Sequence, residues 1–198
     1  QRFPNSCLLF TIIGAINNGL KHPEQSIEAY KKALSINPNY TEAHNNMGNA
    51  LQEQGKLDKA IEAYKKVLMI KPDYQAYYNM GNALQEQGKL DEAIEAYKKA
   101  LLLKPKYSEA YHNMGNTLKE QGQPDKALEA YNKALTINPD FAEAYNNMGV
   151  ALHDQDKQKE ALTAYRKALA INPDFAEAYN NMGLTLKTQA KLDKAVKA

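Results

Sequence analysis

The sequence lacks several features that would assign it to a chemical class directly. Cys7 is its only cysteine, which excludes an internal disulfide framework and favours a reducing compartment, so we expect the cytoplasm. No apolar run approaches the roughly 18 residues that cross a bilayer. The net charge is only +2, which gives no global attraction to nucleic acid. We therefore expect neither a membrane nor a nucleic acid as partner.

Motifs that carry catalysis are also missing. The four histidines form no HxxxH pattern and no Cys/His cluster, so we expect no metal site. The sequence has no Gly-rich phosphate loop, no Gly-x-Ser-x-Gly and no Cys/His pair. We therefore expect no catalytic residue, no cofactor and no enzymatic activity.

What the sequence does contain is one stretch, residues 41–74, that recurs along its length. A period near 34 residues indicates stacked supersecondary units and not one compact globule. Positions within the repeat are numbered here from Thr41. After an N-terminal extension, 1–6, the expected repeats are 7–40 (degenerate), 41–73, 74–107, 108–141, 142–175 and 176–198 (incomplete), called repeats 1 to 6.

Each repeat contains two helical patterns. In the first, Ala43, Met47 and Leu51 fall on one face of a 3.6-residue period. Gly55 interrupts this pattern, and a second one ends before Pro72, which disfavours helical geometry in the residue before it. Two short helices joined by a tight break must pack antiparallel and bury their remaining face on the next pair.

Small and large residues alternate at fixed positions: glycine at position 8, alanine at 20 and tyrosine at 24. In repeat 5 the series reads Tyr145-x₂-Met148-Gly149, Ala161-x₃-Tyr165 and Pro173. This series resembles the tetratricopeptide repeat. The resemblance implies an all-α fold, a right-handed superhelical solenoid of antiparallel helix hairpins, that binds protein or peptide ligands.

The resemblance also implies that first helices line a concave groove through positions 2, 5, 6, 9, 12 and 13. Position 6 is asparagine in repeats 2 to 6, and position 9 is asparagine in repeats 2 to 4; amides both donate and accept hydrogen bonds. We interpret them as a ladder for the backbone of an extended peptide; the alternative is that they stabilise hairpin contacts. The ladder comprises Asn46, Asn79, Asn113, Asn147, Asn181, Asn49, Asn82 and Asn116. Acidic residues, including Glu109 and Glu143, outnumber lysines at these positions and favour basic ligands.

Repeat 3 is irregular. Its connection from the preceding helix is one residue short, and the glutamate of the expected Asp-x-x-Glu helix start is missing after Asp73. Tyr78 stands at position 5, where the other repeats carry a polar residue. Tyrosine is common at binding hot spots, so Tyr78 is a candidate apolar anchor of the groove; the alternative is that it packs on a neighbouring helix.

The sequence also predicts four local features. The first is a longer loop after Gly19, and the second is poorly defined helix ends at Asp156 and Ala190, where other repeats have glycine. The third is an Asn/Asp-x-x-Glu cap at the start of repeats 2, 5 and 6. The fourth is a set of i,i+4 ion pairs on the outer surface: Glu28/Lys32, Glu62/Lys66, Glu95/Lys99 and Glu129/Lys133.

These observations favour a non-catalytic scaffold that binds an extended protein segment. Two alternatives stay open. The chain is also compatible with the substrate-recognition arm of a larger enzyme, such as a glycosyltransferase similar to the O-linked N-acetylglucosamine transferases. The apolar segment 6–16 and the incomplete last repeat are compatible with a homo-oligomer that assembles through the repeat ends.

Overall fold

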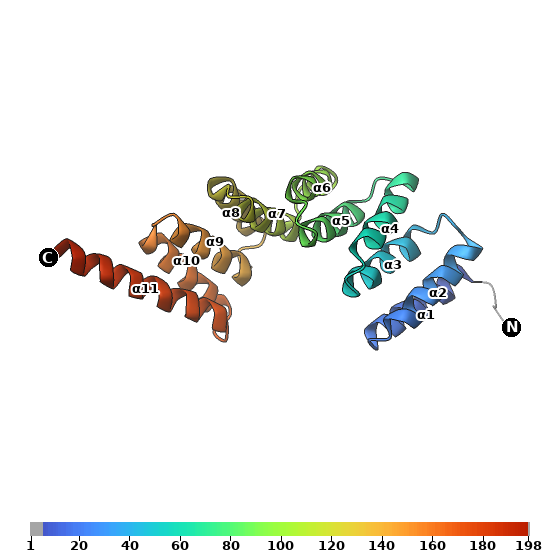
Figure 1. Cartoon of the computed structure of the whole chain (residues 1–198), viewed down its shortest axis with the longest axis horizontal. Helices are drawn as coiled ribbons and strands as arrows, with labels where there is room; N and C mark the ends of the chain where they lie inside the picture. The colour runs from blue at the N-terminus through green and yellow to red at the C-terminus, as the bar shows by residue number, and fades with distance from the viewer. Residues whose placement is uncertain (1–5, 198) are drawn as a thin grey trace. The chain divides into compact units, whose positions relative to one another are not determined.

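The computed structural model describes residues 6–197, and the regular structure of these residues is entirely α-helical (Figure 1). It contains two compact parts, residues 1–105 with α1 to α6 and residues 106–198 with α7 to α11. The helices are α1 (Cys7–Gly19), α2 (Pro23–Ile36), α3 (Thr41–Glu53), α4 (Leu57–Ile70), α5 (Tyr74–Glu86), α6 (Leu90–Leu103), α7 (Ser108–Glu120), α8 (Pro124–Ile137), α9 (Ala142–Asp154), α10 (Gln158–Ile171) and α11 (Ala176–Lys197).

Within each part, every helix packs against the next one along the chain, and each first helix also contacts the first helix of the following repeat. In the N-terminal part α1 contacts α3 and α3 contacts α5; in the C-terminal part α7 contacts α9 and α9 contacts α11. The expected all-α solenoid of helix hairpins is confirmed. The right-handed sense of its superhelix stays a prediction.

The two helices of a hairpin meet at the glycine of position 8. A Cβ atom on Gly48 would lie 2.4 Å from Cε1 of Tyr64, and the Tyr64 ring is completely buried. Burial also raises the pKa of the Tyr64 phenol, because an ionised oxygen there would lose its hydration. The same glycine–tyrosine contact occurs in repeats 1, 3, 4 and 5, at Gly14/Tyr30, Gly81/Tyr97, Gly115/Tyr131 and Gly149/Tyr165.

The break between the helices of a hairpin has a positive φ at position 15. Gly55 has a φ of 69°, while Lys21 and Asp156 take the same conformation at 57° and 59°. The expected longer loop after Gly19 is therefore wrong, since α2 follows α1 at the same spacing as in the other repeats. The expectation for Asp156 is also wrong: α9 ends at Asp154 and α10 begins at Gln158, as the pattern requires.

Repeat 6 has no such break. Its helix α11 continues through Ala190 as far as Lys197 (Figure 1). Alanine has the highest helix propensity of all residues, so the chain at this point extends the first helix and does not turn. The expected second helix of repeat 6 is therefore part of α11.

The helix starts differ from the expected capping pairs. No side-chain bond caps α3 at Tyr40 or α9 at Phe141. In the connections before α3, α9 and α11, the asparagine that precedes the proline bonds the backbone instead, and Asn138 Oδ1 accepts from the backbone N–H of Asp140 at 3.2 Å. The short connection of repeat 3 was expected to lack a cap, but it has one. Asp73 Oδ1 accepts from the Ala76 N–H at 2.9 Å. With one residue fewer, Asp73 itself becomes the N-cap of α5.

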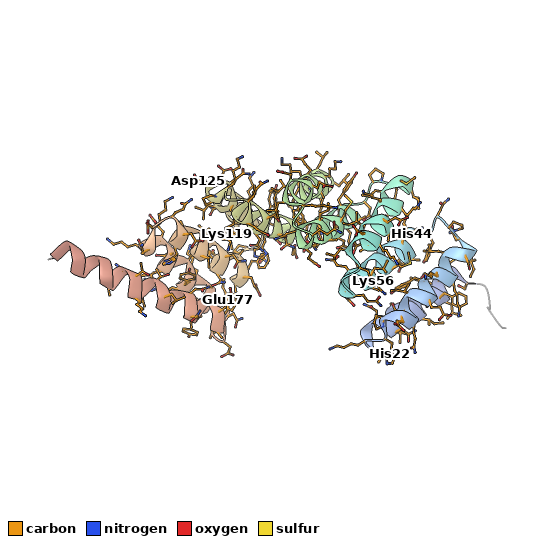
Figure 2. The ribbon with its side chains drawn as sticks, in the orientation of Figure 1. His22, His44, Lys56, Lys119, Asp125 and Glu177 are labelled. Atoms are coloured by element: carbon orange, nitrogen blue, oxygen red, sulfur yellow. The ribbon has the colours of Figure 1, made fainter. Side chains whose placement is uncertain are left out.

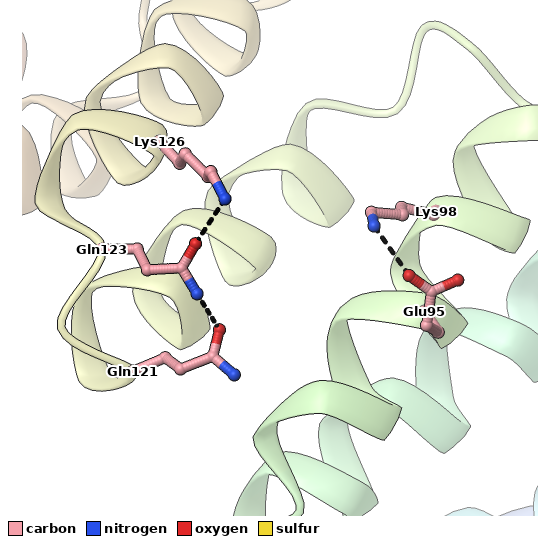
Figure 3. Close-up of polar contacts among 5 residues, drawn as sticks. All are labelled: Glu95, Lys98, Gln121, Gln123 and Lys126. Carbon is pink, nitrogen blue, oxygen red and sulfur yellow. Dashed lines mark hydrogen bonds and ion pairs between the residues drawn. The ribbon is translucent and has the colours of Figure 1, made fainter.

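Of the four expected outer ion pairs, one forms, between Lys32 and Glu28 at 2.9 Å. On α6, Glu95 pairs with Lys98 at 2.7 Å and not with Lys99 (Figure 3). Figure 3 also shows Gln123 bonded to Gln121 and Lys126 across the turn before α8. Three of the position-26 lysines lie instead over the position-4 tyrosine rings, at 5.3 to 5.7 Å from the centroid: Lys99/Tyr77, Lys133/Tyr111 and Lys167/Tyr145.

Candidate functional site

Successive first helices bring the position-6 asparagine of one repeat onto the position-9 side chain of the repeat before it. In the N-terminal part, Asn79 Nδ2 donates to Asn49 Oδ1 at 3.0 Å and to Asn45 Oδ1 at 3.3 Å. In the C-terminal part, Asn147 Nδ2 donates to Asn116 Oδ1 at 3.0 Å. These side chains, with the others at positions 2, 5, 6, 9, 12 and 13, are called the amide face below.

The tyrosine of the second helix holds the position-9 amide from behind. Tyr64, Tyr97 and Tyr131 each donate to the asparagine oxygen of their own repeat at 2.8 Å. Asn49 Oδ1 thus accepts from both Tyr64 and Asn79, which uses both of its lone pairs. The amide is fixed in one orientation, with its Nδ2 group turned away from these two donors.

Parts of these amides keep hydrogen-bonding capacity. Among the described residues, the Nδ2 groups of Asn49 and Asn116 and the Oδ1 atom of Asn79 have no hydrogen-bond partner. None of these atoms is a buried unsatisfied group, so water reaches them. Asn49, Asn79 and Asn116 therefore each stabilise a contact between neighbouring repeats and still present a donor or an acceptor.

The acidic side chains of the amide face receive hydrogen bonds from neutral groups. Tyr40 donates to Glu42 at 3.0 Å, Ser108 donates to Glu109 at 2.9 Å, and Asn146 donates to Glu177 at 3.0 Å. Figure 2 labels Glu177 on α11. A neutral donor leaves the carboxylate charge in place. The acidic positions are Glu42, Glu53, Glu86, Glu109, Glu120, Glu143, Asp154 and Glu177, all exposed, and the basic ones are Lys119 and Lys187.

Tyr78 is half-buried on the amide face. Its ring lies 6.1 Å from the Tyr97 ring of the same hairpin, with 51° between the planes. His112 of repeat 4 makes the same contact with Tyr131, at 6.0 Å and 45°. The irregular connection therefore leaves Tyr78 on the amide face, in the same place that His112 has in repeat 4. Its role as an anchor stays a prediction.

On α9 and α11, position 9 no longer carries an amide side chain. Position 9 changes to Val150 and then Leu184, and Leu184 is exposed. Asn181 of α11 donates to the buried Asn146 at 3.0 Å and not to a position-9 amide. The amide ladder in the C-terminal part thus ends with an apolar step.

Pockets lie on the opposite side of the first helices, which the sequence reading missed. At about 100° per residue, positions 4, 7 and 11 point roughly 180° from the amide face. In repeats 2, 3 and 5 each pocket is lined by the methionine of position 7, the leucine of 11 and the alanine of 23. Methionine at position 7 in five successive repeats was the available signal, because methionine fills irregular and adaptable surfaces.

Among the side chains that the structure describes, no group of three His, Cys, Asp or Glu is arranged to hold a metal ion. None of the described helices has the length and apolar character that crossing a bilayer demands.

The hairpins and their polar first-helix face define a helical-repeat protein of the kind that binds other proteins. Models of the tetratricopeptide repeat match residues 72–140, 41–74 and 130–163, and a further TPR repeat model matches 24–55 and 151–189. The chain belongs to the tetratricopeptide repeat family. No curated protein matches it.

Solved structures agree with this assignment. A crystal structure of MamA is 32% identical, with a TM-score of 0.75, over 83% of this chain and 97% of that one. YrrB, described as a TPR protein with an unusual peptide-binding site, is 22% identical with a TM-score of 0.71, over 90% and 92%. PilF of Pseudomonas aeruginosa is 22% identical with a TM-score of 0.82, over 96% and 87%. The fold and the family make this chain a protein-interaction scaffold.

Proposed function

We propose that the amide face binds an extended, basic segment of a partner protein and that the chain does no chemistry on it. The observation that supports this proposal is the arrangement of the ladder. Fixed amides present a donor at Asn49 and an acceptor at Asn79, on adjacent helices. An extended peptide backbone offers N–H and C=O groups in alternation, so it can bond such a series with little regard to its side chains.

The negative charge of the amide face favours basic ligands over acidic ones. The amide-face positions carry three exposed carboxylates and no lysine in the N-terminal part, and five exposed carboxylates and two lysines in the C-terminal part. Lysine and arginine side chains of a ligand would meet these carboxylates without having to displace an existing cation from Glu42, Glu109 or Glu177, whose hydrogen bonds come from neutral donors. Rim charges of this kind affect association rate and specificity more than total affinity.

A peptide array tests the proposal. Immobilised 12-residue peptides of graded Lys and Arg content are incubated with the protein at two salt concentrations. Binding should rise with basic content and weaken at high salt, because screening acts on exposed charges. Equal binding of acidic and basic peptides would overturn the charge preference.

A paired variant tests the ladder. Asn113→Ala with Asn147→Ala should keep helicity and weaken a bound peptide by about 1–3 kcal/mol per site, the cost of leaving polar partners unmatched. The control Lys133→Ala changes an exposed outer side chain and should leave binding unchanged. A ligand that binds the double variant as tightly as the wild type excludes the ladder.

Tyr78→Ala separates the two roles of that ring. If Tyr78 anchors the ligand, affinity falls while the melting temperature stays the same. If it only packs on Tyr97, melting falls by several degrees and affinity stays.

A second candidate function is self-association, and one observation favours it. The exposed apolar side chains of α1 and its C-cap, each 37–61% exposed, are Leu8, Leu9, Ile12, Ile13, Ile16 and Leu20. Positions 3 and 10, occupied by Leu9 and Ile16, carry fully buried alanine or threonine in repeats 2, 3, 5 and 6, whose first helices pack against the preceding second helix. Larger side chains would hold an ordinary preceding repeat too far away. The helix carries no charge, so a second copy of α1 can meet it without repulsion.

Light scattering across protein concentration tests this second candidate. A dimer that Leu9→Glu with Ile16→Glu converts to monomer supports it. The control is Leu186→Glu, which changes an exposed leucine on α11. A chain that stays monomeric, or a dimer that responds only to the α11 variant, overturns it.

A further inference from the structure

The pocket of repeat 2 differs from its equivalents in charge. It lies between α2, α3 and α4 and has a volume of about 350 Å³. Its floor is apolar and consists of Ile27, Met47, Leu51 and Ala63. The name "outer pocket" is used for this site.

Lysines surround this floor. Lys31, Lys56, Lys59 and Lys66 line the outer pocket together with one carboxylate, Glu62, which leaves a formal charge of +3 from four cations and one anion. In repeat 3 the equivalent pocket is lined by two lysines and three acids, and in repeat 5 by one of each. The repeated apolar site is thus strongly cationic in repeat 2 and not in the others.

One lysine of the outer pocket, Lys66, lacks the aromatic partner that its equivalents have. Lys66 occupies position 26, where Lys99, Lys133 and Lys167 lie over a tyrosine ring. Repeat 2 has His44 in place of that tyrosine (Figure 2). His44 Nε2 lies 2.8 Å from the Pro38 carbonyl oxygen. Within the part of the chain that the structure describes, no salt bridge joins Glu62 to Lys31, Lys59 or Lys66.

We propose that the outer pocket binds an acidic protein segment that inserts one large apolar side chain between Met47 and Leu51 while its carboxylates face the lysines. The volume is at the lower end of the range for ligand pockets and suits one or two side chains. Several separate cations call for several carboxylates, which an acidic segment supplies and a single-headed amphiphile does not. Met47 can adapt to the shape of the inserted group.

This inference goes beyond peptide binding on the amide face, because the two sites lie on opposite sides of α3 and have opposite charge. The amide face attracts basic segments, and the outer pocket attracts acidic ones. The N-terminal part of the chain would therefore hold two chemically distinct partners without competition between them.

Methyl-methionine NMR on the full chain tests the proposal, because Met47 lies in the pocket and Met148 lies in the equivalent pocket of repeat 5. The probe is a capped peptide, Gly-Glu-Asp-Leu-Glu-Asp-Gly. Its addition should shift the Met47 methyl signal and leave Met148 unchanged. Two further peptides replace the leucine by glycine or the four acids by lysine, and both should bind at least tenfold more weakly.

Lys59→Glu with Lys66→Glu should weaken the acidic probe by at least tenfold. Both lysines are exposed, so the melting temperature should stay the same. The matched control is Lys167→Glu, which changes the same repeat position in repeat 5 and should leave the affinity unchanged. Higher salt should weaken the interaction.

Four results would overturn the proposal. They are an unmoved Met47 signal at millimolar probe, equal binding of the glycine-substituted peptide, unchanged affinity of the double lysine variant, and a Met47 shift with sodium decanoate but not with the peptide. The last result would assign the pocket to a small amphipathic anion.

Discussion

His112 occupies position 5 of repeat 4, where Asn45, Asn146 and Asn180 stand in other repeats. Burial lowers the pKa of its imidazole, although the bond to Asn113 and the nearby Glu143 act in the other direction. Its Nε2 atom lies 3.0 Å from Asn147 Nδ2, and an amide nitrogen only donates. Nε2 therefore accepts this bond, and the ring is neutral in the folded chain.

A neutral His112 predicts pH-dependent stability. In the unfolded chain the imidazole has its ordinary pKa of about 6.5. Because the folded pKa is lower, the unfolded state takes up the additional proton as the pH falls, and the free energy of unfolding decreases below about pH 6.5.

His112→Asn should reduce this dependence, which urea unfolding at pH 5 and pH 7.5 measures. The control His22→Asn changes an exposed histidine and should keep the wild-type difference. If His112→Asn kept it too, the ring would not be the group that titrates.

Replacing two of the position-8 glycines by alanine should change the stability of the chain in opposite directions. A Cβ on Gly149 would lie 2.5 Å from Tyr165 Cε1, whereas a Cβ on Gly183 meets nothing within 4 Å. The Tyr165 ring is only 1% exposed, so it cannot move aside without disturbing the core. Gly149→Ala should therefore destabilise by about 1–3 kcal/mol through overpacking. Gly183→Ala should stabilise by roughly 0.5–1 kcal/mol, the usual gain inside a helix. Denaturant midpoints measure both, and equal shifts would contradict the packing.

At the scale of the helix, the starts of α5 and α9 differ although both follow Pro-Asp. Asp73 caps α5 through the Ala76 N–H, while Asp140 lies one residue farther out and Phe141 is the N-cap of α9. Asp73→Ala should destabilise by about 1 kcal/mol, the typical value of an N-cap. Asp140→Ala should cost less than half as much. Thermal melting of the two variants compares them, and an equal loss would show that both aspartates cap.

Helix existence and packing faces were predictable from the sequence, and helix ends were not. Ala43, Met47 and Leu51 show their face through spacing alone, because the face depends only on the 3.6-residue period. A cap depends on one backbone N–H and on the length of the connection before it, which is why Asp73 was misjudged. The turn conformations of Lys21 and Asp156 were missed because sequence reasoning gives positive φ to glycine first.

At the scale of the whole molecule, the candidate site was predictable in position but not in its bonding. Asn79 stands at position 6 of its repeat, and the family pattern places position 6 on the amide face. Its bonds to Asn45 and Asn49 depend on the distance between neighbouring helices, which no single-repeat pattern contains. The outer pocket was missed because its lysines come from α2, from α4 and from the turn before α4, and each alone has the pattern of an ordinary solvated residue.

Stacked hairpins also predict how instability spreads along the chain. In a solenoid, stability is approximately a sum of repeat terms and nearest-neighbour terms, so a defect acts mainly on the repeats that touch it. Gly149→Ala loosens the α9/α10 hairpin, and α9 and α10 contact α7, α8 and α11.

Hydrogen exchange measured by mass spectrometry should therefore show lower protection in α7 to α11 of the Gly149→Ala variant. Protection in α1 to α4 should match that of the wild type, since opening of one region leaves distant regions folded. The reference variant is Gly48→Ala, whose Cβ would lie 2.4 Å from Tyr64 Cε1 and should produce the reverse pattern. A uniform loss across all helices in both variants would mean that the chain unfolds as one cooperative unit, contrary to the nearest-neighbour packing of the hairpins.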